Sequence, residues 1–545
     1  MQIYFVLKLN KLDFYVKLTI AMKFFKYKNN NNVTKKLEMI NIKKFFLFKL
    51  LFILLILSSC FKHSYKEFKI PESINDDETI RILNNFNMIS QIPRCTGNEG
   101  QMVKWLKNWV KKNNFLTLTD RAQNIVIYVP RQGRSTSTET IVMQAHMDMV
   151  CKKDNDSSHN FNKDPIKLVF NDEYLHSSKT TLGADNGIGM STILAIAEDK
   201  TLNRPALELL FTASEENGLV GASKLDLDLI SGKYLINIDT EWWGIFTSAS
   251  TGFKVMEMAI PIEKQTLTKS DKLFSILVKS GKEKHFVHNI HEKHLNAIKV
   301  LSSILKYLNE RLDISIVDFS AGTSPNIIPN EGKLVFKIDS LKQEKLQKAF
   351  EAYLRLNENK LRSIDIQLRI IFDDEPKDQY SDFVPSIYNQ LIIGFLDKLK
   401  HGYEPKLSNN LALAALKGNK FYIGISQRSL FNKDLESYQD SVKDELKKMN
   451  GFLLNAYGYP AWEENINSKL IQKATRLFRQ MYNKEPGIGP ANAGLEPAYF
   501  AQKFPGIDII SLGPTILEGH STNERVKIED LARLYHFLTK LLEEL

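Results

Sequence analysis

The chain has 545 residues, more than a single hydrophobic core usually organises, so the sequence predicts two or more domains. With 43% hydrophobic and 25% charged residues, its composition is that of a globular protein. The net charge of +10 comes from lysines spread along the chain and dense in the first 50 residues. Basic residues are not interleaved with aromatic ones as in nucleic-acid-binding proteins, so we expect no nucleic-acid partner.

The N-terminal region has the pattern of a targeting segment. Lys43, Lys44 and Lys49 accompany an apolar run at residues 50–57, which is too short to span a bilayer comfortably. The run ends in Leu-Ser-Ser-Cys, which resembles the bacterial lipobox, and Cys60 would then be the lipidated N-terminus. This pattern predicts a membrane-anchored bacterial lipoprotein that faces the periplasm or the cell exterior. A short uncleaved membrane anchor is the alternative.

A start at Met39 would give this signal segment ordinary proportions, whereas the residues before it are unusual in front of one. We therefore assign residues 1–59 to targeting and exclude them from the fold. Residues 60–75 are polar and are expected to form a tether.

The chain has three cysteines, Cys60, Cys95 and Cys151, and no two of them form a CxxC pair. This spacing argues against a cysteine zinc site or a redox motif. A disulfide bond between Cys95 and Cys151 is compatible with the sequence, but no pattern indicates one.

From residue 77 the pattern becomes globular, with helices expected at 77–90 and 99–113. Apolar runs of strand length then alternate with helical stretches, and a helix is expected at the end of the chain. This alternation predicts an α/β fold with a mostly parallel sheet covered by helices on both faces. Between about 254 and 435 alternating strands and Lys/Glu-rich helices predict an inserted α+β domain. The main runs are at 139–150, 187–199, 206–216, 234–238, 507–515 and 526–544.

Residues 181–190, TLGADNGIGM, place three glycines around Asp185 before an apolar helical stretch. The glycine spacing fits neither the dinucleotide-binding loop nor the P-loop, and no lysine follows until Lys200. Two interpretations of Asp185 remain: it caps the following helix, or it binds a metal ion.

Polar residues follow several of the predicted strands at their carboxyl ends, where open α/β sheets bind ligands. Each one alone has an ordinary explanation, as a surface group, a helix first-turn charge or a turn residue. Together, two histidines and several carboxylates are a ligand set suited to two divalent ions. The residues are His146, Asp148, Asp185, Glu215, Glu216, Asp239 and His520.

Several stretches together resemble the M20 family of metallopeptidases, and within it the aminoacyl-histidine dipeptidase (Xaa-His dipeptidase) branch. These stretches are QAHMDMV, TTLGADNGIGM, TASEENG, INIDT and SLGPTILEGHS, and the similarity runs from about residue 90 to the C-terminus. The resemblance implies a zinc-peptidase-like catalytic domain at 76–253 and 436–545. It also implies that residues 254–435 form a lid that contributes to substrate binding and to homodimer contacts. The expected substrates are dipeptides or short peptides.

The resemblance also implies a metal-ligand set for two divalent ions, zinc first, with manganese or cobalt as alternatives. His146 would bind one ion and His520 the other, and Asp185 would bridge the two. Glu216 and Asp239 would each complete the ligands of one ion.

Two further carboxylates are implied to take part in catalysis. Glu215 would be the general base, which takes a proton from water and delivers it to the leaving amine. Asp148 would accept a hydrogen bond from His146 and fix its tautomer.

The resemblance is weaker in the lid. His285 aligns with the family's lid histidine, but the surrounding glycines are absent and His288 is a rival. Asn326 is retained from a substrate-binding motif, and Arg428 would offer a cation to the substrate carboxylate. Asn492 replaces a family histidine. Metal-dependent peptide hydrolysis is therefore the firmer prediction, and a preference for histidine the weaker one.

Two alternative functions remain open from the sequence. The chain could be a lipoprotein that uses a peptidase fold as a binding module without turnover, or a hydrolase of N-acyl amino acids. The retained Glu215 argues against the first alternative, because a binding module needs no general base.

Overall fold

The computed structural model describes residues 68–545, except 136, 172, 282–283, 287–294, 365–368 and 404–405. The chain divides into two compact units, Met1–Lys69 and Ile70–Leu545. Cys60 and the predicted targeting segment lie outside the described residues. Among the residues that are described, no helix has both the length and the apolar character needed to cross a membrane.

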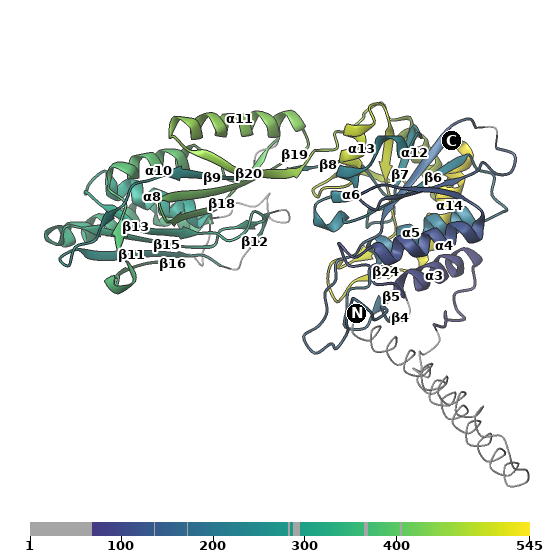
Figure 1. Cartoon of the computed structure of the whole chain (residues 1–545), viewed down its shortest axis with the longest axis horizontal. Helices are drawn as coiled ribbons and strands as arrows, with labels where there is room; N and C mark the ends of the chain where they lie inside the picture. The colour runs from purple at the N-terminus through teal and green to yellow at the C-terminus, as the bar shows by residue number, and fades with distance from the viewer. Residues whose placement is uncertain are drawn as a thin grey trace, which may run out of the picture. The chain divides into compact units, whose positions relative to one another are not determined.

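An eight-stranded sheet carries the candidate site, with strand order β1-β2-β6-β3-β7-β22-β8-β21 (Figure 1). The central strands β6, β3, β7 and β22 are parallel to one another, and β2 joins them antiparallel. The fold class predicted from the apolar runs is therefore confirmed. The strands are β1 (Leu116–Thr119), β2 (Ile125–Val129), β3 (Thr140–His146), β6 (Ala206–Thr212), β7 (Tyr234–Asn237), β8 (Ile245–Ser250), β21 (Gly487–Ala491) and β22 (Asp508–Ser511).

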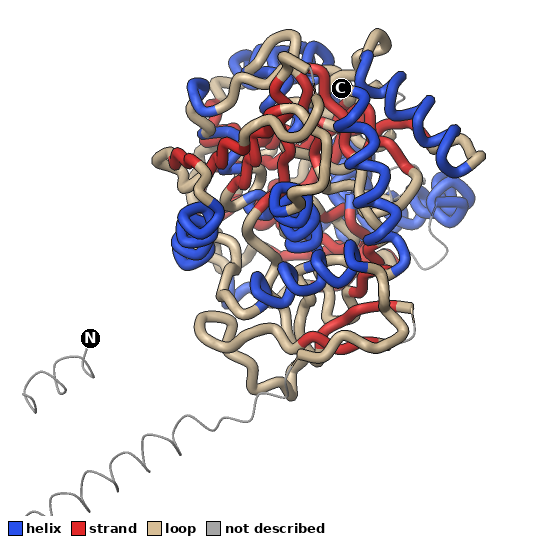
Figure 2. Tube along the Cα trace, turned by 90° about the vertical axis from the view of Figure 1, so that its right-hand side faces the viewer, coloured by secondary structure: helices blue, strands red, loops and turns tan. Residues whose placement is uncertain are grey.

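Helices cover both faces of this sheet. Helices α6 and α13 pack against one face through an apolar cluster that includes Val142, Leu210 and Phe500. Helix α5 packs on β3, with α3 and α14 beside it, and Figure 2 shows the strands in red with helices around them. The helices are α3 (Asp77–Ser90), α4 (Gly100–Asn113), α5 (Ala184–Glu198), α6 (Val220–Lys224), α12 (Lys469–Tyr482), α13 (Pro497–Lys503) and α14 (Glu529–Glu544).

Helix α5 is buried on nearly all sides, because its sequence is apolar or small all round. One predicted helix begins later than expected from its pattern. Residues 526–544 were expected to be helical, but α14 begins at Glu529 and the preceding segment forms β24 (Arg525–Lys527). β24 pairs with β5 (Tyr174–Ser177), and this pairing keeps the segment extended.

A second eight-stranded sheet is antiparallel throughout, with strand order β16-β11-β15-β13-β18-β19-β9-β20. The predicted boundary at residue 435 falls before β20, which belongs to this sheet; the domain boundaries stay a prediction. The strands are β9 (Gly252–Pro261), β11 (Lys272–Lys279), β13 (Ser315–Ala321), β15 (Glu331–Ile338), β16 (Arg369–Asp374), β18 (Ser408–Lys417), β19 (Lys420–Ser429) and β20 (Phe452–Tyr459).

Alternate residues of these strands bury an apolar face under four helices, as in Phe274, Ile276 and Val278 of β11. The helices are α8 (Ala297–Asn309), α9 (Gln343–Ile364), α10 (Ile387–Lys398) and α11 (Asn432–Lys448). Small ladders complete the described strands: β10 (Gln265–Thr266) with β17 (Asp382–Phe383), β12 (Lys284–His285) with β14 (Ile327–Ile328), and β23 (Ile516–Leu517), β24, β5 and β4 (Leu168–Phe170).

A disulfide bond joins Cys95 to Cys151, a pairing that the sequence left open. It lies beside a short parallel bridge in which the Met149 N–H donates to the carbonyl of Arg94 and the Thr96 N–H donates to the carbonyl of Met149. The bond therefore fastens the segment after α3 to the segment that follows β3.

We expect Cys151→Ser to lower the free energy of unfolding by about 4 kcal/mol, because the bond closes a loop across 56 positions. Chemical denaturation of the oxidised wild type and the variant would measure the difference. A reductant should lower the stability of the wild type to that of the variant and leave the variant unchanged. Equal stability of oxidised wild type and variant would contradict the prediction.

Candidate functional site

The carboxyl ends of three adjacent parallel strands meet at one edge of the first sheet. β3 ends at His146, and the short 3-10 helix η1 (Glu215–Asn217) follows β6. β7 ends two residues before Asp239. Because β3 lies between β6 and β7, the strand order alone places these groups side by side.

Asp185 lies between two histidines that come from distant parts of the chain. Its Oδ1 is 2.9 Å from Nε2 of His146, and its Oδ2 is 2.9 Å from Nε2 of His520. Its side chain therefore does not cap α5, and the helix has Gly183 at its cap position. This geometry favours the metal-ligand interpretation of Asp185 over the capping one.

The remaining carboxylates surround this pair of histidines. Nε2 of His520 is 2.8 Å from Oε1 of Glu216, and Nε2 of His146 is 3.5 Å from Oδ1 of Asp239. Ligand atoms of His146, Asp185 and Glu216 all lie within 4.8 Å of one another. The structure thus brings together all five residues of the predicted ligand set.

Asp148 and Glu215 also lie at the cluster. Oδ1 of Asp148 is 3.4 Å from Nδ1 of His146, and its carboxylate accepts the N–H groups of Glu215 (3.0 Å) and Glu216 (3.2 Å). Burial opposes ionisation of Asp148, but the contacts with His146 and the Glu215 N–H outweigh it and lower its pKa. Oε2 of Glu215 is 3.9 Å from Nε2 of His146, so this carboxylate faces the same space.

The charges of the cluster fit divalent cations. Burial and neighbouring carboxylates raise the pKa of Glu215 well above its ordinary range, and burial also raises the pKa of Glu216. Contacts with Asp185 and Glu216 raise the pKa of His520 to about 11. Negative charge exceeds positive charge in this buried space, and imidazole with carboxylate is the ligand chemistry of zinc and similar ions.

Three buried charged residues that the sequence did not reveal lie behind the cluster. Arg94 donates to the carbonyls of Met147 and Asp148, and Glu524 accepts backbone N–H groups of the segment before Asp185. Glu496 accepts from Gln144 and Thr212, and burial raises its pKa to about 7. Their partners are mostly backbone atoms, so no side-chain motif in the sequence could have identified them.

The glycines around Asp185 leave room for Arg94. A Cβ on Gly183, where φ is +70°, would lie 2.5 Å from Nη2 of Arg94, and a Cβ on Gly187 would lie 2.6 Å from the same atom. The glycine-rich stretch therefore admits a buried cation next to the cluster. This is a different use of glycine from a phosphate-binding loop.

A cavity of about 1550 Å³ contains the cluster. Asn326 and Arg428, which the sequence predicted as substrate ligands, also line it. Arg428 is 7% exposed; its Nη1 donates to the hydroxyl of Tyr459 at 3.2 Å, and its guanidinium lies 4.5 Å from the centre of the Phe253 ring. The cavity thus has a carboxylate-rich wall and a wall that offers one buried cation.

The other predicted lid residues are described only in part. The backbone of His285 pairs with Ile327 in the β12–β14 ladder, and the next N–H group, of Phe286, donates to the carbonyl of Asn326 at 2.7 Å. His288 lies outside the described residues. The ladder places the His285 backbone next to the Asn326 segment.

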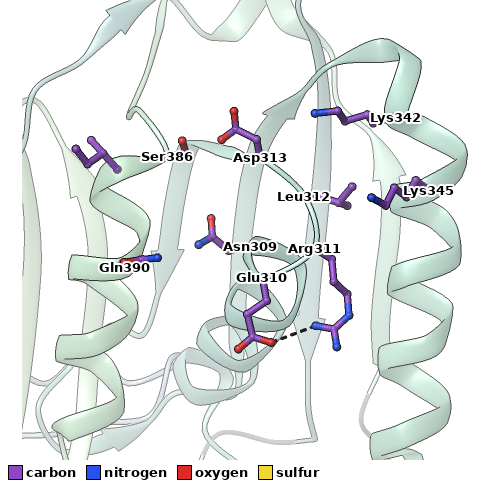
Figure 3. Close-up of a pocket in the computed structure, with 10 residues that line it drawn as sticks. Asn309, Glu310, Arg311, Leu312, Asp313, Lys342, Lys345, Ser386 and Gln390 are labelled. Carbon is purple, nitrogen blue, oxygen red and sulfur yellow. Dashed lines mark hydrogen bonds and ion pairs between the residues drawn. The ribbon is translucent and has the colours of Figure 1, made fainter.

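A second cavity, of about 530 Å³, lies between the end of α8 and the first turns of α9 and α10 (Figure 3). Its lining holds Glu310 and Arg311, paired with each other at 3.2 Å, and two lysines, Lys342 and Lys345. It contains neither histidine nor cysteine. The residues suited to hydrolysis therefore lie in the larger cavity.

Comparison with known proteins identifies the family of the chain. A sequence model of peptidase family M20/M25/M40 matches residues 142–544. The chain belongs to this family. The predicted recognition and the predicted enzyme class, a hydrolase of the peptidase type, are confirmed.

Two similar proteins cover nearly all of the described chain. The cytosol non-specific dipeptidase of Escherichia coli strain K12 is 30% identical over 470 residues, which are 84% of this chain and 96% of that protein. The crystal structure of aminoacylhistidine dipeptidase from Vibrio alginolyticus has a TM-score of 0.79 at 26% identity, over 88% of this chain and 99% of that one. A tripeptidase from Staphylococcus aureus shares the fold, with a TM-score of 0.53, 15% identity, and 85% and 98% coverage.

The predicted localisation as a membrane-anchored lipoprotein is wrong. The relative from Escherichia coli, which matches this M20-family chain over almost its whole length, is a cytosol enzyme, and nothing supports a signal peptide or a lipid anchor. The prediction rested on eight apolar residues, two serines and Cys60. So short a pattern depends on composition and imposes no structural constraint, so it can occur without being processed.

We expect Asp185→Ala to remove both divalent ions from the protein, because this carboxylate contacts both histidines. His520→Ala should chiefly weaken one ion, because His146 and Asp239 remain in place. Metal content after reconstitution with zinc and gel filtration would distinguish the two variants. Full retention of two ions in Asp185→Ala would refute the bridging assignment.

Proposed function

We propose that the protein is a metal-dependent hydrolase that cleaves dipeptides or short peptides. The observation that carries this proposal is the position of Asp185 between His146 and His520, with Glu215 facing the same cavity. The two similar enzymes described above act on dipeptides, as their names state. One is named as non-specific and the other as selective for aminoacyl-histidine, so histidine preference is not part of the proposal.

His146, Asp239, Glu216 and His520 would hold two divalent ions, with Asp185 between them. Zinc fits this mixed imidazole and carboxylate set, and manganese or cobalt are the alternatives. Bound ions of this kind lower the pKa of water and polarise a carbonyl group. Asp148, behind His146, would hold the imidazole in the tautomer that leaves Nε2 free for the ion.

Glu215 would be the general base. Its carboxylate faces the cavity without being within 3.5 Å of either histidine nitrogen, whereas Glu216 lies 2.8 Å from His520. Carboxylate neighbours and burial raise its pKa, which suits a group that must accept a proton and release it again. It would take a proton from the attacking water and give it to the leaving amine.

The lid residues would bind the substrate ends. The buried guanidinium of Arg428 would hold the terminal carboxylate, since a guanidinium binds a carboxylate through two parallel hydrogen bonds. Asn326, whose Oδ1 is buried and has no hydrogen-bond partner among the described residues, would accept an N–H group of the peptide. His285 would stabilise the oxyanion from the adjacent ladder.

A substrate panel on the reconstituted protein tests this proposal against the alternatives. It should contain dipeptides with varied second residues, the matching dipeptide amides and N-acetyl amino acids. We expect the dipeptides to be cleaved and the amides to be poor substrates, because they lack the carboxylate for Arg428. Cleavage of N-acetyl amino acids alone would favour the acyl-amino-acid hydrolase, and binding without turnover would favour the binding module.

Glu215→Gln and Glu216→Gln are a matched pair that tests the roles of these two carboxylates. Glutamine at 215 keeps the shape but cannot accept the proton, so turnover should fall by roughly 10²–10⁴ with metal content near wild type. Glutamine at 216 should lose metal as well as activity, because Glu216 contacts His520. Peptidase assays with metal analysis measure both effects, and exchanged phenotypes would show that the roles are reversed.

A homodimer through the lid is also part of the proposal. β20 is the last strand of the second sheet, and its Phe452, Leu453, Leu454 and Tyr457 are 39–45% exposed. An exposed apolar edge strand is a surface that pairs readily with another chain. Light scattering should give twice the monomer mass, and a monomer mass at every concentration would refute this part alone.

A further inference from the structure

The N-terminus of α5 is capped by a carboxylate from the far end of the chain. Gly183 stands at the cap position and has no side chain to accept N–H groups. Glu524 takes this place: its Oε2 accepts from Leu182 (2.8 Å) and Gly183 (3.0 Å). Its Oε1 accepts from Ala184 (2.7 Å) and Asp185 (3.2 Å). One side chain therefore binds four consecutive N–H groups that end at Asp185.

A buried cation binds the same segment through its carbonyl groups. Arg94, 2% exposed, donates to the carbonyl of Gly183 and also to those of Met147 (3.1 Å) and Asp148 (2.9 Å). Glu524 and Arg94 thus hold opposite polar groups of one loop. The loop that carries Asp185 has little freedom to shift relative to the segment after β3.

Glu524 also belongs to the segment that carries His520. Its own N–H donates to the carbonyl of Ser521 at 3.2 Å, and β24 begins at the next residue and pairs with β5. The side chain is 2% exposed, so water does not compete for its oxygens. The four bonds consequently fix the Asp185 loop against the His520 loop, whose side chains approach to 2.9 Å.

We propose that Glu524 is a positioning residue for the ion that Asp185 would share with Glu216 and His520. It touches neither the ion nor the substrate, and it acts by setting the separation of two ligands on different loops. This inference rests on the metal part of the proposed function and is independent of the substrate. Loss of Glu524 should therefore weaken one ion selectively.

Zinc titration of the metal-free full chain, in competition with a chelator of known affinity, tests this proposal. Glu524→Gln replaces one oxygen by an NH₂ group that faces N–H donors, so two of the four bonds are lost. We expect the affinity for one zinc ion to fall by about 10–100-fold, the range found when groups that orient metal ligands are removed. The affinity for the other ion should stay near wild type.

Glu518→Gln is the matched control. Glu518 lies on the same loop, two residues before His520, but its carboxylate is half-exposed and pairs with Arg525 at 2.7 Å. The substitution removes the same charge from the same loop without touching the four N–H groups. Both zinc affinities should remain at the wild-type values, and a selective loss here would show that loop charge, not Glu524, sets the affinity.

A purely structural role of Glu524 predicts a different result. In that case both ions would weaken equally, and the melting temperature of the metal-free protein would fall by a matching amount; this result would overturn the proposal. Glu524→Asp keeps the charge but is one methylene too short for all four bonds, so it should show the same selective loss if the glutamine variant does not fold. Unchanged zinc binding in Glu524→Asp and Glu524→Gln also overturns the proposal.

The wild-type protein separates this inference from the one on which it rests. If wild type takes up no zinc, the metal part of the proposed function fails. If wild type and Glu524→Gln bind two ions equally well, only the role of Glu524 fails.

Discussion

The concentration of carboxylates in one buried cavity is the constraint on which the rest of the structure depends. Asp148, Asp185, Glu215, Glu216 and Asp239 converge from separate segments, against two imidazoles. Carboxylates in such a space repel one another and lose hydration, which disfavours their charged forms. Two divalent ions relieve this repulsion directly, so the folded arrangement and the metal ions stabilise each other.

The scaffold holds these groups through a second polar layer beneath the cavity. Gln144 accepts from Asn237 at 2.6 Å, and Thr212 donates to Glu496 at 2.7 Å. These strand residues lie two or three positions before His146, Asp239 and Glu215, so the layer connects β3, β6 and β7 just below the site. Burial lowers the pKa of Arg94 to about 10, which leaves it cationic at neutral pH and able to balance part of the negative charge. The ligands are thus fixed by the sheet before any ion binds.

The predictable part of the site is the part that follows strand ends. His146, the Glu215–Glu216 pair and Asp239 could be inferred because each closes an apolar run, and parallel strands bring such ends together. Arg94 and Glu524 could not be inferred, because their partners are backbone groups of distant segments, which no side-chain pattern reports. The Cys95–Cys151 bond was left open for a similar reason: sequence spacing carries no information on the distance between the two residues. The lipoprotein prediction failed because it used a short pattern that no three-dimensional contact supports.

The two walls of the cavity differ in how completely their polar groups are satisfied. On the metal side, each carboxylate of the predicted ligand set faces an imidazole, an amide or another partner. On the other side, Asn326 Oδ1 and Arg428 Nε are buried without a hydrogen-bond partner among the described residues. Buried polar groups without partners are unfavourable, so a bound molecule that supplies both a donor and a carboxylate would stabilise this wall. On the proposed assignment, a peptide supplies both, and the chemistry of bond cleavage is separated in space from the recognition of the substrate. Substitutions among the lid motifs can then alter which peptides bind while the metal side remains unchanged. This separation accounts for a chain that keeps the complete ligand set of its family and yet has Asn492 and an altered His285 region on the substrate side.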